Sequence, residues 1–261
     1  MTDFDDYRDS YPSVRMRRED GILELTLNTD GGSLVWGAAT RTHYDLAGAF
    51  NDVSRDIENR VVVMTGTGDV HSGPRADDAD YPMLDLERWD AMRFNSMQCL
   101  HSLLAIEAPV ISCINGPVYR HAELALLGDI VLAADAATVQ DSAHFVRGQV
   151  PGDGSHIVFP YLLGPRRASY FMLTGQELDA GELRELGLVN EVMAAEELLP
   201  RAHEIARELA RQNSLTLRHT RTLLVQPLRE LAAKWLGYGF ALEGQGTVLE
   251  ASLRAANDTT P

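Results

Sequence analysis

The sequence predicts an α/β fold in which a large core domain is followed by C-terminal helices. Short β-branched segments that end in glycine alternate with helical patterns in the first part of the chain, as in folds with crossover helices. After Pro165 the patterns become largely helical. The length of 261 residues suits one large domain with a small helical appendage. We therefore expect a core domain over residues 1–200 and a helical region over residues 201–261.

Four segments are typical of strands. Residues 22–28 alternate, so that three leucines share one face. The runs 61–66 and 109–116 are short, β-branched and end in glycine, which is typical of buried strands. Residues 130–141 predict one strand and the start of another. Between these segments lie helical patterns at about 40–56, 88–105 and 122–128.

The second half contains clear helix boundaries. Pro165 opens a helical segment that closes at Gly175, and Asp179 is a predicted N-cap of the next helix. Three longer helical patterns follow. We expect Pro200 in the first turn of its helix and expect Pro227 to break or kink its helix, because proline lacks an N–H and clashes with the preceding turn.

Composition excludes several classes of function. The net charge of −15 disfavours binding to nucleic acids and to anionic membranes. Cys99 and Cys113 form no metal-binding or redox motif, and we expect both to be buried thiols. The acidic N-terminus differs from a signal peptide, and no apolar run reaches the length of about 18 residues that a membrane-spanning helix needs. We expect a cytoplasmic protein.

Three stretches resemble the crotonase superfamily, also called the enoyl-CoA hydratase/isomerase superfamily. They read "PVISCINGPV", "AELALLGDIVLAADAATVQD" and the long run from "VPGDGSHIVF" to "LGLVNEV". The resemblance implies a spiral of ββα repeats followed by C-terminal helices. It also implies a homo-oligomer, a trimer or a hexamer built as a dimer of trimers, with residues 201–261 as the trimerisation region.

The chain departs from the hydratases of that superfamily at their oxyanion hole. The segment "NGPVYRHAE" lacks the glycine triplet, and "HSGPRADDADY" contains a proline that cannot donate an N–H. Glu123 aligns with one hydratase carboxylate, whereas His144 replaces the other. The segment "NTDGGSLVWG" has no Lys or Arg that would bind the phosphates of coenzyme A. These differences point away from a CoA thioester substrate.

A closer resemblance is to 6-oxocamphor hydrolase and related β-diketone hydrolases, in "SLVW", "YRHAEL", "DSAHF" and "VPGDGSH", and more loosely in "FALEGQG". It implies cleavage of a C–C bond between two carbonyls by addition of water and a retro-Claisen step. The implied catalytic residues are His144, Asp153 and His121. The implied substrate-binding residues are Trp36, Tyr81, Phe145 and Glu243.

This chemistry gives each residue an expected role. His144 is the base that activates water, and Asp153 orients its ring. His121 donates a hydrogen bond to a carbonyl oxygen as it gains charge, and the Trp36 indole N–H holds the second carbonyl. Tyr81 and Phe145 are expected apolar walls. We expect neither a metal nor an organic cofactor.

Other interpretations stay open. An enoyl-CoA hydratase or isomerase, a non-catalytic binding protein of the same fold, and a cyclase or lyase are alternatives to the hydrolase. Trp36 could fill the core, Glu123 could cap a helix, and Asp153 could be an ordinary acid in a turn. His156 lies close enough in sequence to compete for Asp153, and the other histidines are expected to be helix or loop residues.

Overall fold

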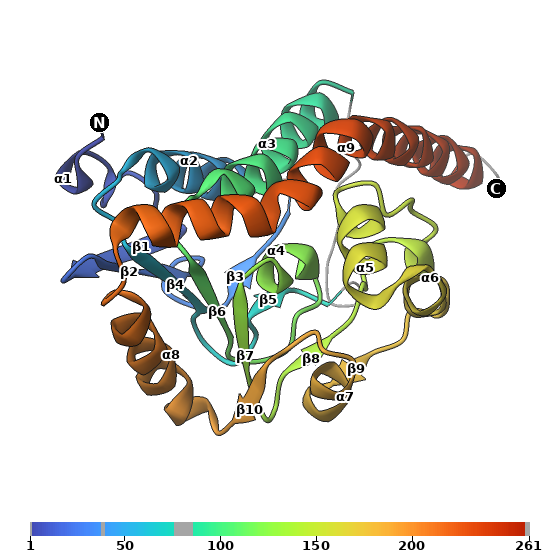
Figure 1. The fold of residues 1–261 in the computed structure, drawn as a ribbon. Coiled ribbons are helices and arrows are strands. Elements are labelled where there is room, and N and C mark those ends of the chain that lie inside the picture. The colour runs from blue at the N-terminus through green and yellow to red at the C-terminus, as the bar shows by residue number, and fades with distance from the viewer. Residues whose placement is uncertain (1, 38–39, 76–85, 259–261) are drawn as a thin grey trace.

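A central six-stranded sheet carries the fold in the computed structural model, which describes residues 2–37, 40–75 and 86–258 (Figure 1). β1 and β2 pair antiparallel, and the other neighbouring strands pair parallel. Because parallel neighbours need crossover connections, the predicted α/β fold is confirmed. In spatial order the strands are β1 (Val14–Glu19), β2 (Ile22–Leu27), β4 (Val61–Gly66), β6 (Val110–Ile114), β7 (Ile130–Ala134) and β10 (Glu191–Met193).

Helices cover both faces of this sheet. Every residue of β6 is buried, as are the first five of β4, and such continuous apolar runs are typical of parallel strands between two helical layers. One layer consists of α2 (Thr42–Arg55), α3 (Leu86–Ala105) and the first part of α9 (Ser214–Asp258), which pack on Leu23, Leu25 and Met64. The other contains α8 (Ala195–Leu209), which packs on Val61 and Val63 (Figure 1).

Smaller elements surround this core. Two short sheets pair β3 (Leu34–Val35) with β5 (Ser72–Gly73) and β8 (Thr138–Val139) with β9 (Leu178–Asp179). The remaining helices are α1 (Phe4–Tyr7), α4 (Ala122–Leu126), the 3-10 turn η2 (Phe145–Arg147), α5 (Ser155–Leu163), α6 (Pro165–Thr174) and α7 (Ala180–Glu185). The predicted boundaries at Pro165, Gly175 and the Asp179 N-cap are confirmed. Cys99 and Cys113 are free and buried.

The C-terminal helices differ from the prediction at Pro200, and at Pro227 the structure excludes a break. Pro200 lies in the second turn of α8, because the helix already begins at Ala195. Pro227 does not end its helix: α9 continues through it as one helix of 45 residues and changes direction along its length (Figure 1). The domain boundary expected after residue 200 falls inside α8, which packs against the central sheet.

A close approach of two glycines holds the turn before α5 against α9. A Cβ atom on Gly152 would overlap the backbone of Gly239, and one on Gly239 would overlap Gly152 and the ring of His156. Glycine, which has no Cβ, allows two backbones to come this near. The His156 ring also contacts the carbonyl oxygens of Pro151, at 3.1 Å, and Trp235, at 3.3 Å. The turn and the middle of α9 therefore form one packed unit.

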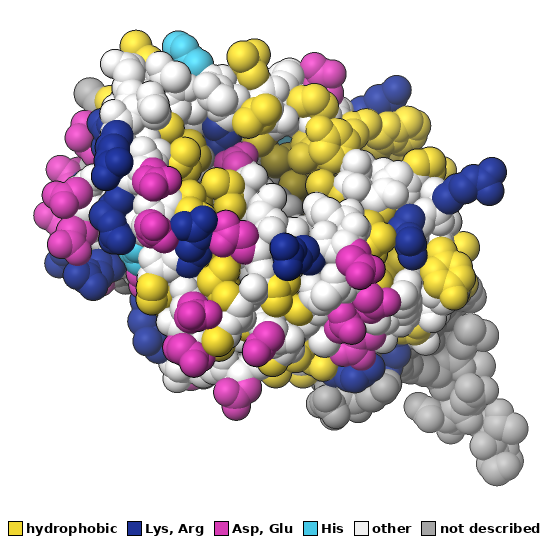
Figure 2. Space-filling view, turned by 60° about the horizontal axis from the view of Figure 1, so that its bottom comes forward, with side chains coloured by type: hydrophobic (Ala, Val, Ile, Leu, Met, Phe, Trp, Pro, Cys, Tyr) yellow, Lys and Arg dark blue, Asp and Glu magenta, His cyan; other side chains and the backbone are white. Residues whose placement is uncertain are grey.

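The distribution of surface charge agrees with the expectation that the protein does not bind nucleic acids. On the face shown in Figure 2, basic and acidic side chains of the described residues are interspersed, and no continuous basic area forms there. Within the part of the chain that the structure describes, no helix is both long enough and apolar enough to cross a membrane.

Candidate active site

The three predicted catalytic residues and Glu243 meet in one buried cluster. His121 precedes α4 in the segment that follows β6, and its backbone adopts the left-handed conformation with φ of 48°. His144 precedes η2, and Asp153 lies in the turn before α5. Glu243 reaches the cluster from α9 of the same chain. The side chains of His144, Asp153 and Glu243 are buried, and that of His121 is 13% exposed.

Asp153 occupies the centre of the cluster. Its Oδ2 atom lies 3.3 Å from Nδ1 of His121 and 3.4 Å from Nε2 of His144. Its Oδ1 atom accepts a hydrogen bond from the backbone N–H of Ser155, at 3.3 Å. Asp153 is therefore not a solvated turn residue but a carboxylate shared by two imidazole rings.

On one side of Asp153, His121 contacts an acid and a second imidazole. Its Nδ1 lies 2.8 Å from Oε1 of Glu123, whose Oε2 accepts a hydrogen bond from Ser155 Oγ at 3.3 Å. Its Nε2 lies 3.1 Å from Nε2 of His43, a residue of α2. The Trp36 ring packs against the His121 ring, with centroids 4.1 Å apart. Both nitrogens of His121 thus already have partners inside the protein.

On the other side, His144 lies between three acids. Its Nδ1 is 2.7 Å from Oδ1 of Asp141, and its Nε2 is 3.9 Å from Oε1 of Glu243 in addition to the contact with Asp153. The predicted proximity of His144 and Asp153 is present. However, Asp153 is not the acid that lies closest to the His144 ring, because Asp141 contacts Nδ1 at a shorter distance.

Burial and charge move the pKa values of the histidines in opposite directions. Burial lowers the pKa of His43 well below its usual value, and the neighbouring His121 lowers it further. Burial also lowers the pKa of His144, but the Asp153 and Asp141 carboxylates outweigh it and hold the pKa well above its usual value. The same balance, with Glu123 and Asp153 as the carboxylates, raises the pKa of His121.

The acids of the cluster also differ from one another. Burial raises the pKa of Asp153, but the charges on His144 and His121 outweigh it and lower the pKa far below its usual range. Burial raises the pKa of Glu243 to about 8, so its carboxyl group is protonated at neutral pH. Burial and the nearby Asp153 charge also raise the pKa of Glu123. The cluster therefore combines carboxylates, a protonated acid and imidazoles of different basicity.

The other predicted binding residues are placed differently. The Trp36 indole N–H donates to Ser72 Oγ at 2.7 Å, so it is not free for a substrate carbonyl in this structure. Phe145 does not join the buried cluster, because its side chain is 49% exposed on η2. Tyr81 lies outside the described residues. His156 does not compete for Asp153, because its ring contacts backbone carbonyls instead.

Two members of the cluster were not predicted. His43 looked like an ordinary helix residue, and its sequence distance from His121 gave no sign of the contact. Asp141 carried a usable signal, because residues three positions apart in a tight segment can face each other, as Asp141 and His144 do. The segment "DSAHF" contains both residues, so Asp141 is the acid nearest to His144 in the sequence.

Three atoms of the cluster are spaced as ligands of a metal ion would be. One ligand atom each from His121, Glu123 and Asp153 lie within 4.8 Å of one another. In the structure these atoms contact each other directly, and Ser155 occupies the second oxygen of each acid. We interpret the group as a hydrogen-bond network.

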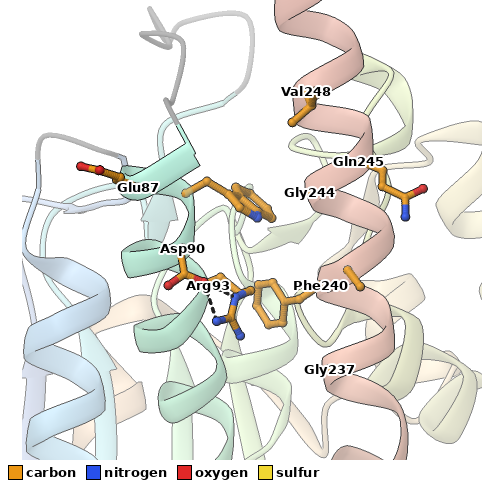
Figure 3. A pocket seen from close by; sticks show the side chains of 10 residues that line it. Glu87, Asp90, Arg93, Gly237, Phe240, Gly244, Gln245 and Val248 are labelled. Carbon is orange, nitrogen blue, oxygen red and sulfur yellow. Dashed lines mark hydrogen bonds and ion pairs between the residues drawn. The ribbon is translucent and has the colours of Figure 1, made fainter.

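A pocket of about 940 Å³ lies between α3 and α9. Figure 3 shows Phe240 of α9 and Arg93 of α3 extending into the space between the two helices, with Arg93 paired to Asp90. The pocket is also lined by Gly237, Ala241 and Gly244 of α9. Its size and largely apolar wall suit a small organic molecule.

Known proteins resemble this chain in sequence and in structure. Carnitinyl-CoA dehydratase of Salmonella arizonae is 28% identical over 216 residues, which cover 78% of this chain and 77% of that protein. A β-diketone hydrolase from the cyanobacterium Anabaena, solved with (S)-3-oxocyclohexyl acetic acid, is 41% identical with a TM-score of 0.85, covering 92% of this chain and 96% of the other.

A more distant solved structure shares the fold. An enoyl-CoA hydratase/isomerase from Mycobacterium paratuberculosis has a TM-score of 0.81 at 23% identity, covering 91% of this chain and 94% of the other. The family model for enoyl-CoA hydratase/isomerase matches residues 19–237, which is most of the chain. The predicted superfamily is therefore confirmed: the chain belongs to the enoyl-CoA hydratase/isomerase family.

Proposed function

We propose that this protein hydrolyses a C–C bond of a cyclic β-diketone to give a keto acid. The proposal depends on the position of Asp153 in a buried cluster. One oxygen of its carboxylate, Oδ2, contacts both His121 and His144. This arrangement suits the activation of water next to a carbonyl that must be polarised. The similarity to a β-diketone hydrolase, at 41% identity over nearly the whole chain, supports the same reaction.

The reaction begins when His144 removes a proton from water. Neutral His144 has a lone pair on Nε2, the nitrogen that faces Asp153 and Glu243. The water oxygen forms a bond to one substrate carbonyl carbon while its proton moves to Nε2. Asp153 then faces an imidazolium ion, and its negative charge stabilises that ion.

The carbonyl oxygen becomes an alkoxide that needs a hydrogen-bond donor. We assign this task to the Nε2–H of protonated His121, whose pKa is raised by Glu123 and Asp153. This N–H exchanges its contact with His43 for the substrate oxygen. The left-handed backbone of His121 and the packing of Trp36 against its ring fix the direction of this N–H. A donor held in place before the reaction stabilises developing charge without reorganisation.

Collapse of the alkoxide breaks the C–C bond and leaves its electron pair as an enolate on the second carbonyl. Glu243 is the acid that protonates the enolate carbon, since burial keeps its carboxyl group protonated at neutral pH. The imidazolium of His144, 3.9 Å away, then returns a proton to Glu243. The water has supplied one oxygen and one hydrogen to the new carboxylic acid and one hydrogen to carbon.

The test is turnover of monocyclic and bicyclic 1,3-diketones, followed by loss of the enol absorbance and appearance of the keto acid. Crotonyl-CoA and carnitinyl-CoA are incubated in parallel. We expect keto acid from at least one diketone and no turnover of the thioesters. Turnover of a CoA thioester without diketone hydrolysis would overturn the proposal.

That outcome would favour a second candidate, a hydratase or dehydratase of CoA thioesters. The similarity to carnitinyl-CoA dehydratase and the buried carboxyl group of Glu123 support this alternative. The two functions differ in whether they need His144. Glu123 is the important acid in the second candidate, whereas His144 and Asp153 are essential in the first.

A further inference from the structure

We propose that Asp141 is a positioning residue that orients the His144 ring and keeps its Nδ1 protonated, so that Nε2 is the nitrogen that reacts. This inference rests on the proposed hydrolase function for its catalytic consequence. It moves the orienting role from Asp153, where the sequence placed it, to an acid three residues before the histidine. Asp153 is then free to interact with both imidazole rings.

The two carboxylates that flank His144 contact it unequally. The distance from Nδ1 to Asp141 is 2.7 Å, which is typical of a strong charge-assisted hydrogen bond. The distance from Nε2 to Asp153 is 3.4 Å, and the same Asp153 oxygen also contacts His121 at 3.3 Å. The stronger and unshared contact is the one that fixes the ring.

The local backbone makes the Asp141 contact rigid. The carbonyl oxygen of His144 accepts hydrogen bonds from the N–H groups of Arg147, at 2.7 Å, and Gln149, at 3.1 Å. Asp141 is itself buried, and within the described residues its Oδ2 has no hydrogen-bond partner. A buried carboxylate with one oxygen unpaired is costly, so its short bond to His144 is one of the interactions that offset burial, together with the nearby charge of Arg120.

The location of the proton follows from these contacts. A neutral imidazole has one N–H, and a carboxylate at 2.7 Å holds that proton on Nδ1. The lone pair is then on Nε2, toward Glu243 and Asp153. In the opposite tautomer two lone pairs would meet at Nδ1 and the reactive nitrogen would be blocked by its own proton. Without Asp141 both tautomers form.

Charged and titratable groups from several elements act on His144, and the test must separate them. Asp153 comes from the turn before α5, Glu243 from α9 and His121 from the segment before α4. The Arg120 guanidinium interacts with both Asp141 and Asp153. Because Asp141 and Asp153 contact different ring nitrogens, a tautomer measurement distinguishes them whereas activity alone does not.

The experiment combines ¹⁵N-histidine NMR with kinetics on Asp141→Asn, Asp153→Asn and the exposed control Asp135→Asn. His144 signals are assigned with His144→Gln. We expect wild type, Asp153→Asn and Asp135→Asn to show the Nδ1–H tautomer in the neutral form. In Asp141→Asn we expect mixed tautomers, a lower pKa of His144, and a kcat lower by about 10- to 100-fold with little change in KM.

A second variant, Asp141→Glu, keeps the charge and should restore part of the tautomer preference and of the kcat. The proposal is overturned if Asp141→Asn, folded by circular dichroism, leaves the tautomer of His144 unchanged, or if Asp153→Asn alone mixes the tautomers. If the wild-type protein hydrolyses no diketone, the proposed function fails. The NMR result then decides the role of Asp141 by itself.

Discussion

The two sides of Asp153 place the same type of side chain in different surroundings. His121 lies against a second imidazole, His43, and one acid, Glu123. His144 has carboxylates at both ring nitrogens, and its pKa is raised well above the usual value. In the proposed reaction this difference corresponds to distinct tasks: the side rich in carboxylates moves a proton, and the side rich in imidazoles presents a donor.

Replacement of His144 tests the proton-moving side and should have the largest effect. We expect His144→Gln to lower kcat on a diketone by about 100- to 10,000-fold, since general base catalysis typically contributes that much. The KM should change little, because the ring acts on water. Steady-state kinetics on the folded variant measure both quantities, and a kcat within a few-fold of wild type contradicts the assignment.

Replacement of His121 tests the donor side. His121→Gln should lower kcat by about 100- to 1,000-fold, as for other donors to a developing oxyanion. The matched variant His43→Gln keeps a polar partner beside His121 and should cost much less. Equal losses in the two variants would show that the imidazole pair acts as a unit.

Glu243 supplies a proton in the proposed reaction, so Glu243→Gln should remove the alkaline limb of the pH profile. The carboxyl group has a pKa of about 8 because it is buried. In wild type, kcat/KM should therefore fall as the pH rises through about 8 and the acid loses its proton. The variant should be slower by about 100-fold, with no fall at that pH.

The acidic limb of the same profile should report His144. The base must be neutral, and the Asp153 and Asp141 carboxylates raise its pKa above the usual value. Activity should therefore fall as the pH drops through a range higher than that of an ordinary histidine. Measurement of kcat/KM against pH shows where this limb lies. A limb at the usual histidine value would mean that the two carboxylates do not both act on the ring.

The smallest effect is expected at Trp36. The indole N–H bonds to Ser72, so Trp36→Phe should lower the free energy of unfolding by about 1 kcal/mol and kcat by only a few-fold. Urea unfolding and steady-state kinetics measure the two effects. A loss of activity near that of His121→Gln would show that the indole N–H leaves Ser72 and binds the substrate.

The sequence predicted the frame of the molecule better than its details. The buried strands could be predicted because parallel strands between helices read as continuous apolar runs. The continuation of α9 through Pro227 could not. Proline removes a helix hydrogen bond, but Val225, Leu228, Leu236 and Phe240 of the same helix are buried in the core, and their burial offsets the loss.

Part of the site was predictable, but its pairings were not. His121, His144 and Asp153 could be found because they lie in the motifs that resemble β-diketone hydrolases. Which carboxylate takes which ring nitrogen depends on ring rotation and on contacts from distant elements. Asp141 and His43 were therefore missed, although both lie within hydrogen-bonding distance of a predicted histidine.

The contact between Gly152 and Gly239 has a mechanical consequence. Asp153 directly follows Gly152, and Glu243 lies one helical turn after Gly239. The two acids therefore move as a single body. The distance between the shared carboxylate and the proton donor is thereby fixed by backbone contact. A displacement of α9 would therefore carry both acids together and leave their separation unchanged.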